Sequence, residues 1–149
     1  MLYRPYIPQD SPTLYAIEEA CFQPPHRFSR SYMRQIVRQP RVATWIAERD
    51  TRMLGFAIVE WGRELENRFA YIQTLEVLPE ARGLGIGAEL LRRLEDSARN
   101  AASHAIWLHV DAKNSAAMRL YQKHGYQLGG REQDYYGHNR PGLVYAKSL

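Results

Sequence analysis

Residues 75–91 read LEVLPEARGLGIGAELL, and this stretch decides how the rest of the chain can fold. An apolar run ends at Pro79, and a glycine-rich turn follows it within a few residues. After the turn, apolar side chains recur at helical spacing, with charged side chains between them. These apolar positions are Ile86, Leu90, Leu91, Leu94 and Ala98. The glycines therefore lie where a strand passes into the N-terminus of a helix.

A helix N-terminus that follows glycines is suited to binding an anion. Its first backbone N–H groups have no acceptor within the helix, and the helix dipole places positive potential there. Gly85 and Gly87 have no Cβ, so a phosphate can approach the backbone, and Arg82 can add a fixed positive charge. We therefore expect a diphosphate cradle, formed by Arg82, Gly83, Leu84, Gly85, Ile86, Gly87 and Ala88.

The spacing of the glycines excludes two other phosphate-binding motifs. A P-loop ends in Gly-Lys-Ser or Gly-Lys-Thr, whereas Ala88 and Glu89 follow Gly87 here. A dinucleotide-binding turn has Gly-x-Gly-x-x-Gly, whereas the third glycine here comes only two residues after the second. The order Arg-x-x-Gly-x-Gly after a strand ending in Leu-Pro-Glu resembles instead the pyrophosphate loop of the GNAT N-acetyltransferase superfamily, which binds acetyl-coenzyme A (acetyl-CoA).

A second stretch carries the same resemblance. Residues 114–126 read NSAAMRLYQKHGY, which is similar to the family signature Asn-x-x-Ala-x-x-x-Tyr followed by Gly-Phe or Gly-Tyr. The resemblance implies that Asn114 hydrogen-bonds the coenzyme and that Tyr121 protonates the departing thiolate. It also implies that backbone groups of Leu75 and Val77 pair with the pantetheine arm. Without the resemblance, Asn114 reads as a helix cap and Tyr121 as a core residue.

The composition is that of an ordinary globular protein. The 149 residues suit a single domain over residues 1–149, with 45% hydrophobic and 24% charged residues. No apolar run reaches the roughly 20 residues of a membrane helix, and the N-terminus lacks the apolar core of a signal peptide. The single cysteine excludes an internal disulfide, so we expect a cytoplasmic protein. The net charge of +4 is dispersed, which argues against a nucleic-acid surface, and we expect no metal site.

Periodicity and turn residues predict elements in the order β-α-α-β-β-β-α-β-α-β-β. The predicted strands cover residues 2–7, 42–48, 53–61, 69–78, 105–110 and 143–148, with one more beginning at 126–128. The predicted helices start at Asp10 or Ser11, at Ser29 or Ser31, at the cradle and at Ser115, and residues 22–28 and 62–67 are predicted loops. The result is an α/β fold like that of the GNAT family. Its mixed, mostly antiparallel sheet has about seven strands with a central parallel pair, and about four helices accompany it.

Alternation along two predicted strands identifies a candidate base. One face of the first strand is expected to carry Tyr71, Gln73, Leu75 and Val77, and the other Ile72, Thr74, Glu76 and Leu78. In the next strand, Trp107 and His109 share a face. A charged histidine is costly inside a buried strand, but histidine also moves protons best near neutral pH. His109 is therefore either a hydrogen-bonded core residue or a catalytic base.

The runs YIQTL (71–75) and WLHV (107–110) resemble those of protein N-terminal acetyltransferases, notably the eukaryotic kind that acts on methionine-starting peptides. The resemblance implies that Tyr71 and His109 hold a water that relays the proton from the α-amine. The bacterial relative that acetylates the alanine terminus of a ribosomal protein carries glutamate where His109 stands, so this chain departs from it.

The acceptor site is expected where aromatic residues gather in loops. Tyr135 and Tyr136 resemble the paired tyrosines that close over the peptide backbone in N-terminal acetyltransferases, although tyrosine pairs are also common on edge strands. With the aromatic loop at residues 22–28 they would form the acceptor mouth. We assign acceptor binding to Phe22, Phe28, Gln73, Tyr135 and Tyr136.

Two other residues compete for a catalytic role. Glu76 is a rival base, but alternation points it away from Tyr71, so we expect a salt-bridged or solvated carboxylate. Cys21 could suggest a covalent acyl-enzyme, but a lone helical cysteine is more often a small packing residue.

These features together predict an acetyl-CoA-dependent N-acetyltransferase that acts by direct attack of the amine on the thioester. The expected acceptor is the α-amine of a peptide or protein. The alternatives are a small amine such as a polyamine, aminoglycoside or amino acid, and a non-catalytic domain that binds coenzyme A as a sensor. A monomer or a homodimer is compatible with the sequence.

Overall fold

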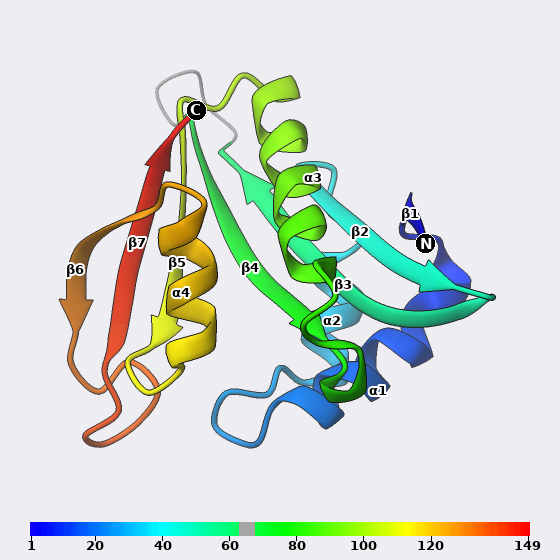
Figure 1. Cartoon of the computed structure of the whole chain (residues 1–149), viewed down its shortest axis with the longest axis horizontal. Coiled ribbons are helices and arrows are strands. Elements are labelled where there is room, and N and C mark those ends of the chain that lie inside the picture. The colour runs from blue at the N-terminus through cyan, green and yellow to red at the C-terminus, as the bar shows by residue number, and fades with distance from the viewer. Residues whose placement is uncertain (63–67) are drawn as a thin grey trace.

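The computed structural model describes residues 1–62 and 68–149, and a mixed seven-stranded sheet organises them (Figure 1). The strand order is β1-β2-β3-β4-β5-β7-β6, and only β4 and β5 pair in parallel. The strands are β1 (Leu2–Pro5), β2 (Val42–Arg49), β3 (Arg52–Trp61), β4 (Phe69–Val77), β5 (Ala105–Asp111), β6 (Gln127–Glu132) and β7 (Gly142–Ser148). The helices are α1 (Ser11–Cys21), α2 (Arg30–Ile36), α3 (Ile86–Asn100) and α4 (Ser115–Lys123), with short 3-10 turns at Pro8–Asp10 and Pro79–Ala81. The predicted element order and fold class are confirmed. The predicted loop at 62–67 lies outside the described residues except for Gly62.

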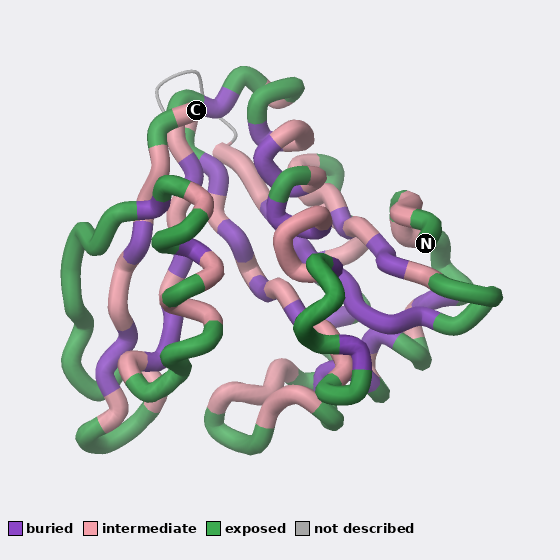
Figure 2. Tube along the Cα trace, viewed as in Figure 1, coloured by how far each residue is buried: buried purple, intermediate pink, exposed green. Residues whose placement is uncertain are grey.

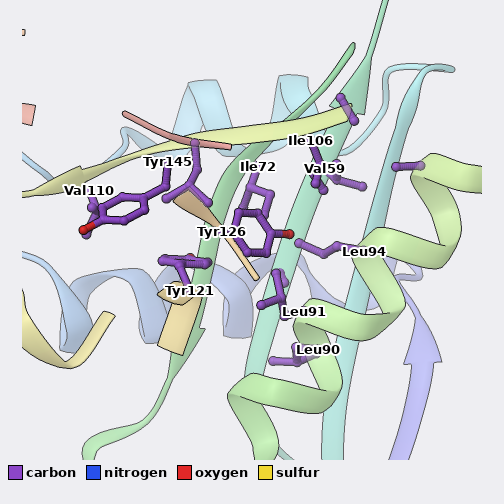
Figure 3. Close-up of a cluster of buried hydrophobic side chains, with 14 of the residues drawn as sticks. Val59, Ile72, Leu90, Leu91, Leu94, Ile106, Val110, Tyr121, Tyr126 and Tyr145 are labelled. Carbon is purple, nitrogen blue, oxygen red and sulfur yellow. The ribbon is translucent and has the colours of Figure 1, made fainter. Parts of the chain in front are cut away.

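Helices cover both faces of the sheet, and each face has its own core (Figures 1 and 2). On the α3 face, Leu90, Leu91 and Leu94 are fully buried against residues of β3, β4 and β5 (Figure 3). Burying one such side chain contributes about 1.5–3 kcal/mol. On the other face, α1 and α2 pack through a second cluster that includes Leu14, Met33 and Phe56. The sheet is therefore a fixed platform on which side chains of β4 and β5 can be positioned.

A side-chain cap begins α2, whereas α1 begins at Ser11, one of the two predicted starts, without a side-chain cap. Ser29 Oγ accepts a hydrogen bond from the Tyr32 N–H at 3.0 Å, which starts α2 as predicted. Asp10 precedes α1, but its carboxylate does not cap the helix. It accepts hydrogen bonds from the Arg4 guanidinium at 2.8 Å and from the Ile7 N–H at 2.9 Å. A charged partner within reach competes successfully with the weaker capping bond.

A β-bulge in β4 overturns the predicted alternation. Ile58 of β3 pairs with Thr74, but the next residue of β3 pairs with Ile72, so Gln73 is an extra residue. Paired residues share a face, and the extra residue reverses the alternation beyond it. Tyr71 and Glu76 therefore lie on the same face, toward α1 and α2, whereas Leu75 and Val77 pack against the α3 core. The expectation that Glu76 points away from Tyr71 is wrong.

Strand β6 is longer than predicted. It runs through Gly129 and Gly130 to Glu132, and all six of its residues are exposed. Tyr126, expected to begin the strand, precedes it and is buried, with its hydroxyl donating to Glu95 at 2.8 Å. Backbone pairing with β7 holds this glycine-containing strand in place.

Candidate active site

A cleft opens where β4 and β5 stop pairing. Their parallel ladder ends at the pair Tyr71 and Trp107, although β4 continues to Val77 and β5 to Asp111. The cleft has a volume of about 2150 Å³. The segment between α1 and α2 and the segment between β6 and β7 border it. It is larger than the about 300–1,000 Å³ of an ordinary small-molecule site, so it has room for two reactants.

His109 is the centre of a hydrogen-bonded cluster on the cleft wall, and we call Tyr71, His109, Glu132 and Tyr135 the His109 cluster. The Tyr71 hydroxyl lies 2.8 Å from His109 Nδ1, and Glu132 Oε1 lies 3.1 Å from Nε2. The Tyr135 ring stacks on the imidazole with a centroid distance of 4.0 Å. The structure therefore brings the predicted residues Tyr71, His109 and Tyr135 together and adds Glu132, which was not predicted.

The Tyr71 hydroxyl remains protonated at neutral pH. Burial raises the pKa of Tyr71 above its ordinary value, and the neighbouring Tyr135 adds to the rise. A neutral tyrosine can donate to the imidazole and accept from a second donor at the same time. The Tyr71 hydroxyl can therefore donate its hydrogen to His109 Nδ1.

A second cluster lines the cleft between its two bordering segments. His26, between α1 and α2, lies 2.7 Å from Asp111 Oδ2 and stacks on the Tyr136 ring at 4.4 Å. Arg140 donates to the same Asp111 oxygen at 2.9 Å. Burial would raise the pKa of Asp111, but hydrogen bonds from the Lys113 N–H, His26 and Arg140 hold it below its usual value. Tyr135 and Tyr136 lie in the segment between β6 and β7, so they are not edge-strand residues.

The remaining predicted acceptor residues also line the cleft. Phe22 and Phe28 contribute aromatic surface from the segment between α1 and α2. Gln73, the extra residue of the bulge, accepts from the Tyr32 hydroxyl at 2.9 Å and donates to Glu60 Oε1 at 2.5 Å. These bonds fix the Gln73 amide at the entrance. Neither Tyr32 nor Glu60 was predicted.

The diphosphate cradle has the features that an anion requires. Among the described residues, the backbone N–H groups of residues 83–88 donate to no protein acceptor. Gly83 and Gly85 have φ values of +79° and +81°, which side chains rarely adopt, and a Cβ on either would meet nothing within 4 Å. The backbone is therefore open, which fits the diphosphate of a coenzyme. The Arg82 side chain is turned away, because its Nε donates to the Val77 carbonyl at 3.0 Å.

The other predicted coenzyme residues surround the inner end of the cleft. Asn114 Oδ1 accepts from the Ala117 N–H at 3.1 Å, so it caps α4 while also lining the cleft. Tyr121 lines the cleft and is only 6% exposed, and burial raises the pKa of its hydroxyl. Among the described residues that hydroxyl has no hydrogen-bonding partner. Leu75 lines the cleft too, and a Cβ on Gly87 would lie 3.7 Å from its side chain and 4.0 Å from that of Val77.

Glu76 forms a buried pair with Glu18, which contradicts the prediction of a salt-bridged or solvated carboxylate. The two residues are 2% and 0% exposed. Burial raises the pKa of Glu76 well above its ordinary value, and the adjacent Glu18 carboxyl adds to the rise. The Thr74 hydroxyl donates to Glu76 Oε2 at 2.6 Å, and the Phe28 N–H donates to Glu18 Oε2 at 3.0 Å. Within the described residues each remaining Oε1 lacks a donor, so the proton of Glu76 is available to bridge the pair.

Cys21 has the surroundings of a packing residue with a protonated thiol. Its Sγ lies 3.5 Å from the Val77 carbonyl, and burial raises the pKa of the thiol. The thiolate needed for a covalent acyl-enzyme is therefore disfavoured at neutral pH.

In the described part of the chain, no helix is long and apolar enough to cross a membrane. The same residues contain no group of three or more His, Cys, Asp or Glu side chains that could hold a metal ion.

Sequence reasoning missed Glu132, His26, Asp111 and Arg140 because long-range contacts create their roles. Glu132 belongs to an edge strand with two glycines, a composition that disfavours strands. The aromatic loop around His26 was the available signal for the second cluster, but its partner Asp111 is 85 positions away.

Comparison with known proteins gives one family match over most of the chain. Residues 11–126 match the model described as "Acetyltransferase (GNAT) family". An uncharacterised N-acetyltransferase of Mycobacterium tuberculosis is 32% identical over 91 residues, which are 61% of this chain and 56% of that protein. The aligned part thus spans little more than half of that relative.

Two further proteins extend the comparison over nearly the whole chain. A candidate [ribosomal protein bS18]-alanine N-acetyltransferase of Bacillus subtilis is 27% identical over 131 residues, covering 88% of this chain and 83% of that protein. The crystal structure of Arabidopsis thaliana NAA60 in complex with a bisubstrate analogue superposes with a TM-score of 0.86. It covers 99% of this chain and 97% of the other at 21% identity, a likeness that establishes the fold.

Proposed function

The chain belongs to the GNAT acetyltransferase family, and on that basis we propose that it transfers an acetyl group from acetyl-CoA to the N-terminal α-amine of a peptide or protein. The observation that carries the proposal is the 2.8 Å contact between the Tyr71 hydroxyl and His109 Nδ1, at the point where β4 and β5 separate. It supplies a proton acceptor on the wall of a cleft that has room for both reactants.

The proton on the amine is the chemical problem that these residues address. An α-amine has a pKa of about 8 and a lysine amine one of about 10.4, so either enters largely as ammonium at neutral pH. The amine must lose a proton before it can attack. His109 takes that proton at Nδ1 through the Tyr71 hydroxyl, directly or by way of a water. General-base assistance of this kind is worth about 10²–10⁴ in rate.

Residues of the inner cleft and the cradle would hold acetyl-CoA, which supplies the activated acetyl group as a thioester. The free N–H groups of residues 83–88 would bind the diphosphate, and the side-chain amide of Asn114 is available for the pantetheine arm. Burial raises the pKa of Tyr121, so its hydroxyl is protonated at neutral pH and would be the hydrogen-bond donor that faces a departing thiolate. Placing both reactants in one cleft removes the need for a covalent intermediate.

The cleft mouth supports a peptide rather than a small amine as acceptor. Tyr135 and Tyr136 come from one bordering segment, and Phe22 and Phe28 come from the opposite one. His26 joins the two segments through Tyr136 and Asp111, so an extended chain could lie between them. A small amine has no need of two aromatic walls. Cytoplasmic location and a monomeric or homodimeric state belong to the same proposal.

An acceptor panel tests this function. Release of free coenzyme A would be measured with lysine-free peptides bearing a free α-amine, and with N-acetylated peptides containing lysine. A polyamine, an aminoglycoside and a free amino acid would complete the panel. We expect turnover with the first group alone. Turnover only with small amines would contradict the peptide assignment, and coenzyme binding without turnover would indicate a non-catalytic binding domain.

A further inference from the structure

The structure points to Glu132 as the residue that selects the tautomer of His109. We propose that its carboxylate holds His109 as the Nε2–H tautomer and accepts the proton from Nε2 during turnover. The catalytic part of this inference rests on the proposed acetyl transfer, whereas the tautomer can be measured without it.

The two hydrogen bonds of the imidazole are both satisfied by one placement of its hydrogen, on Nε2. An ionised carboxylate can only accept, so Nε2, which lies 3.1 Å from Glu132 Oε1, carries a hydrogen. In a neutral imidazole Nδ1 is then unprotonated and accepts from the Tyr71 hydroxyl at 2.8 Å. The proton-accepting nitrogen therefore faces the cleft residue Tyr71.

The strand arrangement lets a side chain of β6 reach β5 across β7. His109 pairs with Val144 and Val144 with Gly130, so Glu132, two residues further on, lies on the same face as His109. The β7 partner of Glu132 is Gly142, which has no side chain to block the path. A Cβ on Gly142 would also lie 3.0 Å from the Tyr135 ring. Glycine at this position thus permits both the stacked ring and the crossing carboxylate.

The cluster connects the cleft to the solvent. The His109 side chain is 8% exposed and that of Glu132 is 54% exposed. During amine deprotonation, the Tyr71 hydroxyl would receive the ammonium proton as its own proton moves to Nδ1. The Nε2 proton would then pass to Glu132, which releases it to water. Tyr71 ends as a neutral hydroxyl and His109 as its Nδ1–H tautomer. Proton exchange with water then places a hydrogen on Nε2 and removes the one on Nδ1, which restores the starting tautomer. The net change is one proton moved from the ammonium group to water.

Few ionisable groups face the imidazole. Tyr71 approaches from β4, Glu132 from β6 and Tyr135 from the segment between β6 and β7. On its own strand, Asp111 is engaged by His26 and Arg140. Glu132 is therefore the carboxylate in direct contact with the ring among the described residues.

Nitrogen-15 NMR of the histidine side chains tests the tautomer directly. We expect Nε2–H for His109 in the wild type and in Glu132→Gln, because the amide oxygen still accepts the bond. In Glu132→Ala the two tautomers should mix. Asp96→Asn is the charge-matched control, since Asp96 pairs with Arg92 and Arg99 on the exposed side of α3. An Nδ1–H tautomer in the wild type would overturn the proposal.

Kinetics test the transfer of the proton. With the fastest acceptor of the panel, we expect Glu132→Gln to lower kcat about tenfold, with the KM for acetyl-CoA unchanged and the pH–rate profile altered. Glu132→Asp should recover part of the rate, and Asp96→Asn should match the wild type. A wild-type rate and pH profile in Glu132→Gln would refute the proton transfer. If no amine is acetylated, the proposed function fails. The NMR result still decides whether Glu132 fixes the tautomer of His109.

Discussion

Glu132 and Glu76 are the same residue type on the same face of one sheet, yet they have opposite surroundings. Glu132 has a side chain that is 54% exposed and contacts an imidazole. Glu76 is 2% exposed and contacts another carboxyl and a hydroxyl. The first can exchange a proton with water, whereas burial keeps a proton on the second. Placement relative to solvent therefore gives the two glutamates different roles in our proposal, a proton path for Glu132 and a packing role for Glu76.

Removing the imidazole should have the largest effect. We expect His109→Ala to lower the amine-dependent rate by about 10²–10⁴, because deprotonation then falls to bulk water. Coenzyme affinity, measured by calorimetry, should change little. His104→Ala is the control, since that histidine is exposed. Full activity in His109→Ala would transfer the base role elsewhere and erase the contrast between the two glutamates.

Glu76→Gln should change stability rather than rate. The pKa of Glu76 is raised in the folded state, so its contribution to stability is fully present below the unfolded pKa of about 4.3 and is lost as pH rises toward the folded pKa. Over that window the wild type loses about 1.4 kcal/mol per pH unit from this group. Glu76→Gln has no titrating group at this position and avoids the loss. Its unfolding free energy relative to that of the wild type should therefore increase with pH.

Urea unfolding at several pH values checks this prediction. Asp96→Asn is the control, and its stability difference from the wild type should depend little on pH, since Asp96 is half exposed and pairs with arginines. If the difference in unfolding free energy between Glu76→Gln and the wild type did not change with pH, the carboxyl pair would share no proton.

Tyr121→Phe asks whether the buried Tyr121 hydroxyl takes part in the chemistry. Loss of the hydroxyl should lower kcat about tenfold, because the thiolate then leaves without a proton donor. Tyr126→Phe is the neighbouring control. It breaks the bond to Glu95 and should reduce stability by about 1–2 kcal/mol without changing the rate per folded molecule. Equal rates in both variants would remove Tyr121 from the mechanism.

Thr74→Val should have the smallest effect. It leaves Glu76 Oε2 without its donor and should cost about 1 kcal/mol of unfolding free energy. Thr44→Val is the contrasting control, because the buried Thr44 hydroxyl has no partner within the described residues and its loss should be neutral or stabilising. Thermal unfolding at one pH compares the two. If Thr74→Val left the thermal stability unchanged, the hydrogen bond from Thr74 would contribute little to holding Glu76.

Local patterns in the sequence predicted some of these residues and missed others for physical reasons. The cradle, Asn114 and Tyr121 follow from short motifs whose geometry is local. Tyr71 and His109 were found from strand alternation and from the resemblance of the runs 71–75 and 107–110 to those of N-terminal acetyltransferases. The strand face predicted for Glu76 was wrong because the bulge at Gln73 depends on pairing with β3. Glu132 was missed because its role depends on the register of three strands, which no local pattern reports.

A crystal structure of the protein with coenzyme A bound tests the proposed site most directly. We expect the diphosphate on the backbone N–H groups of residues 83–88 and the thiol end in the cleft between β4 and β5, near Tyr121. Coenzyme bound elsewhere on the protein, or a cradle left without the diphosphate at saturating coenzyme, would contradict it.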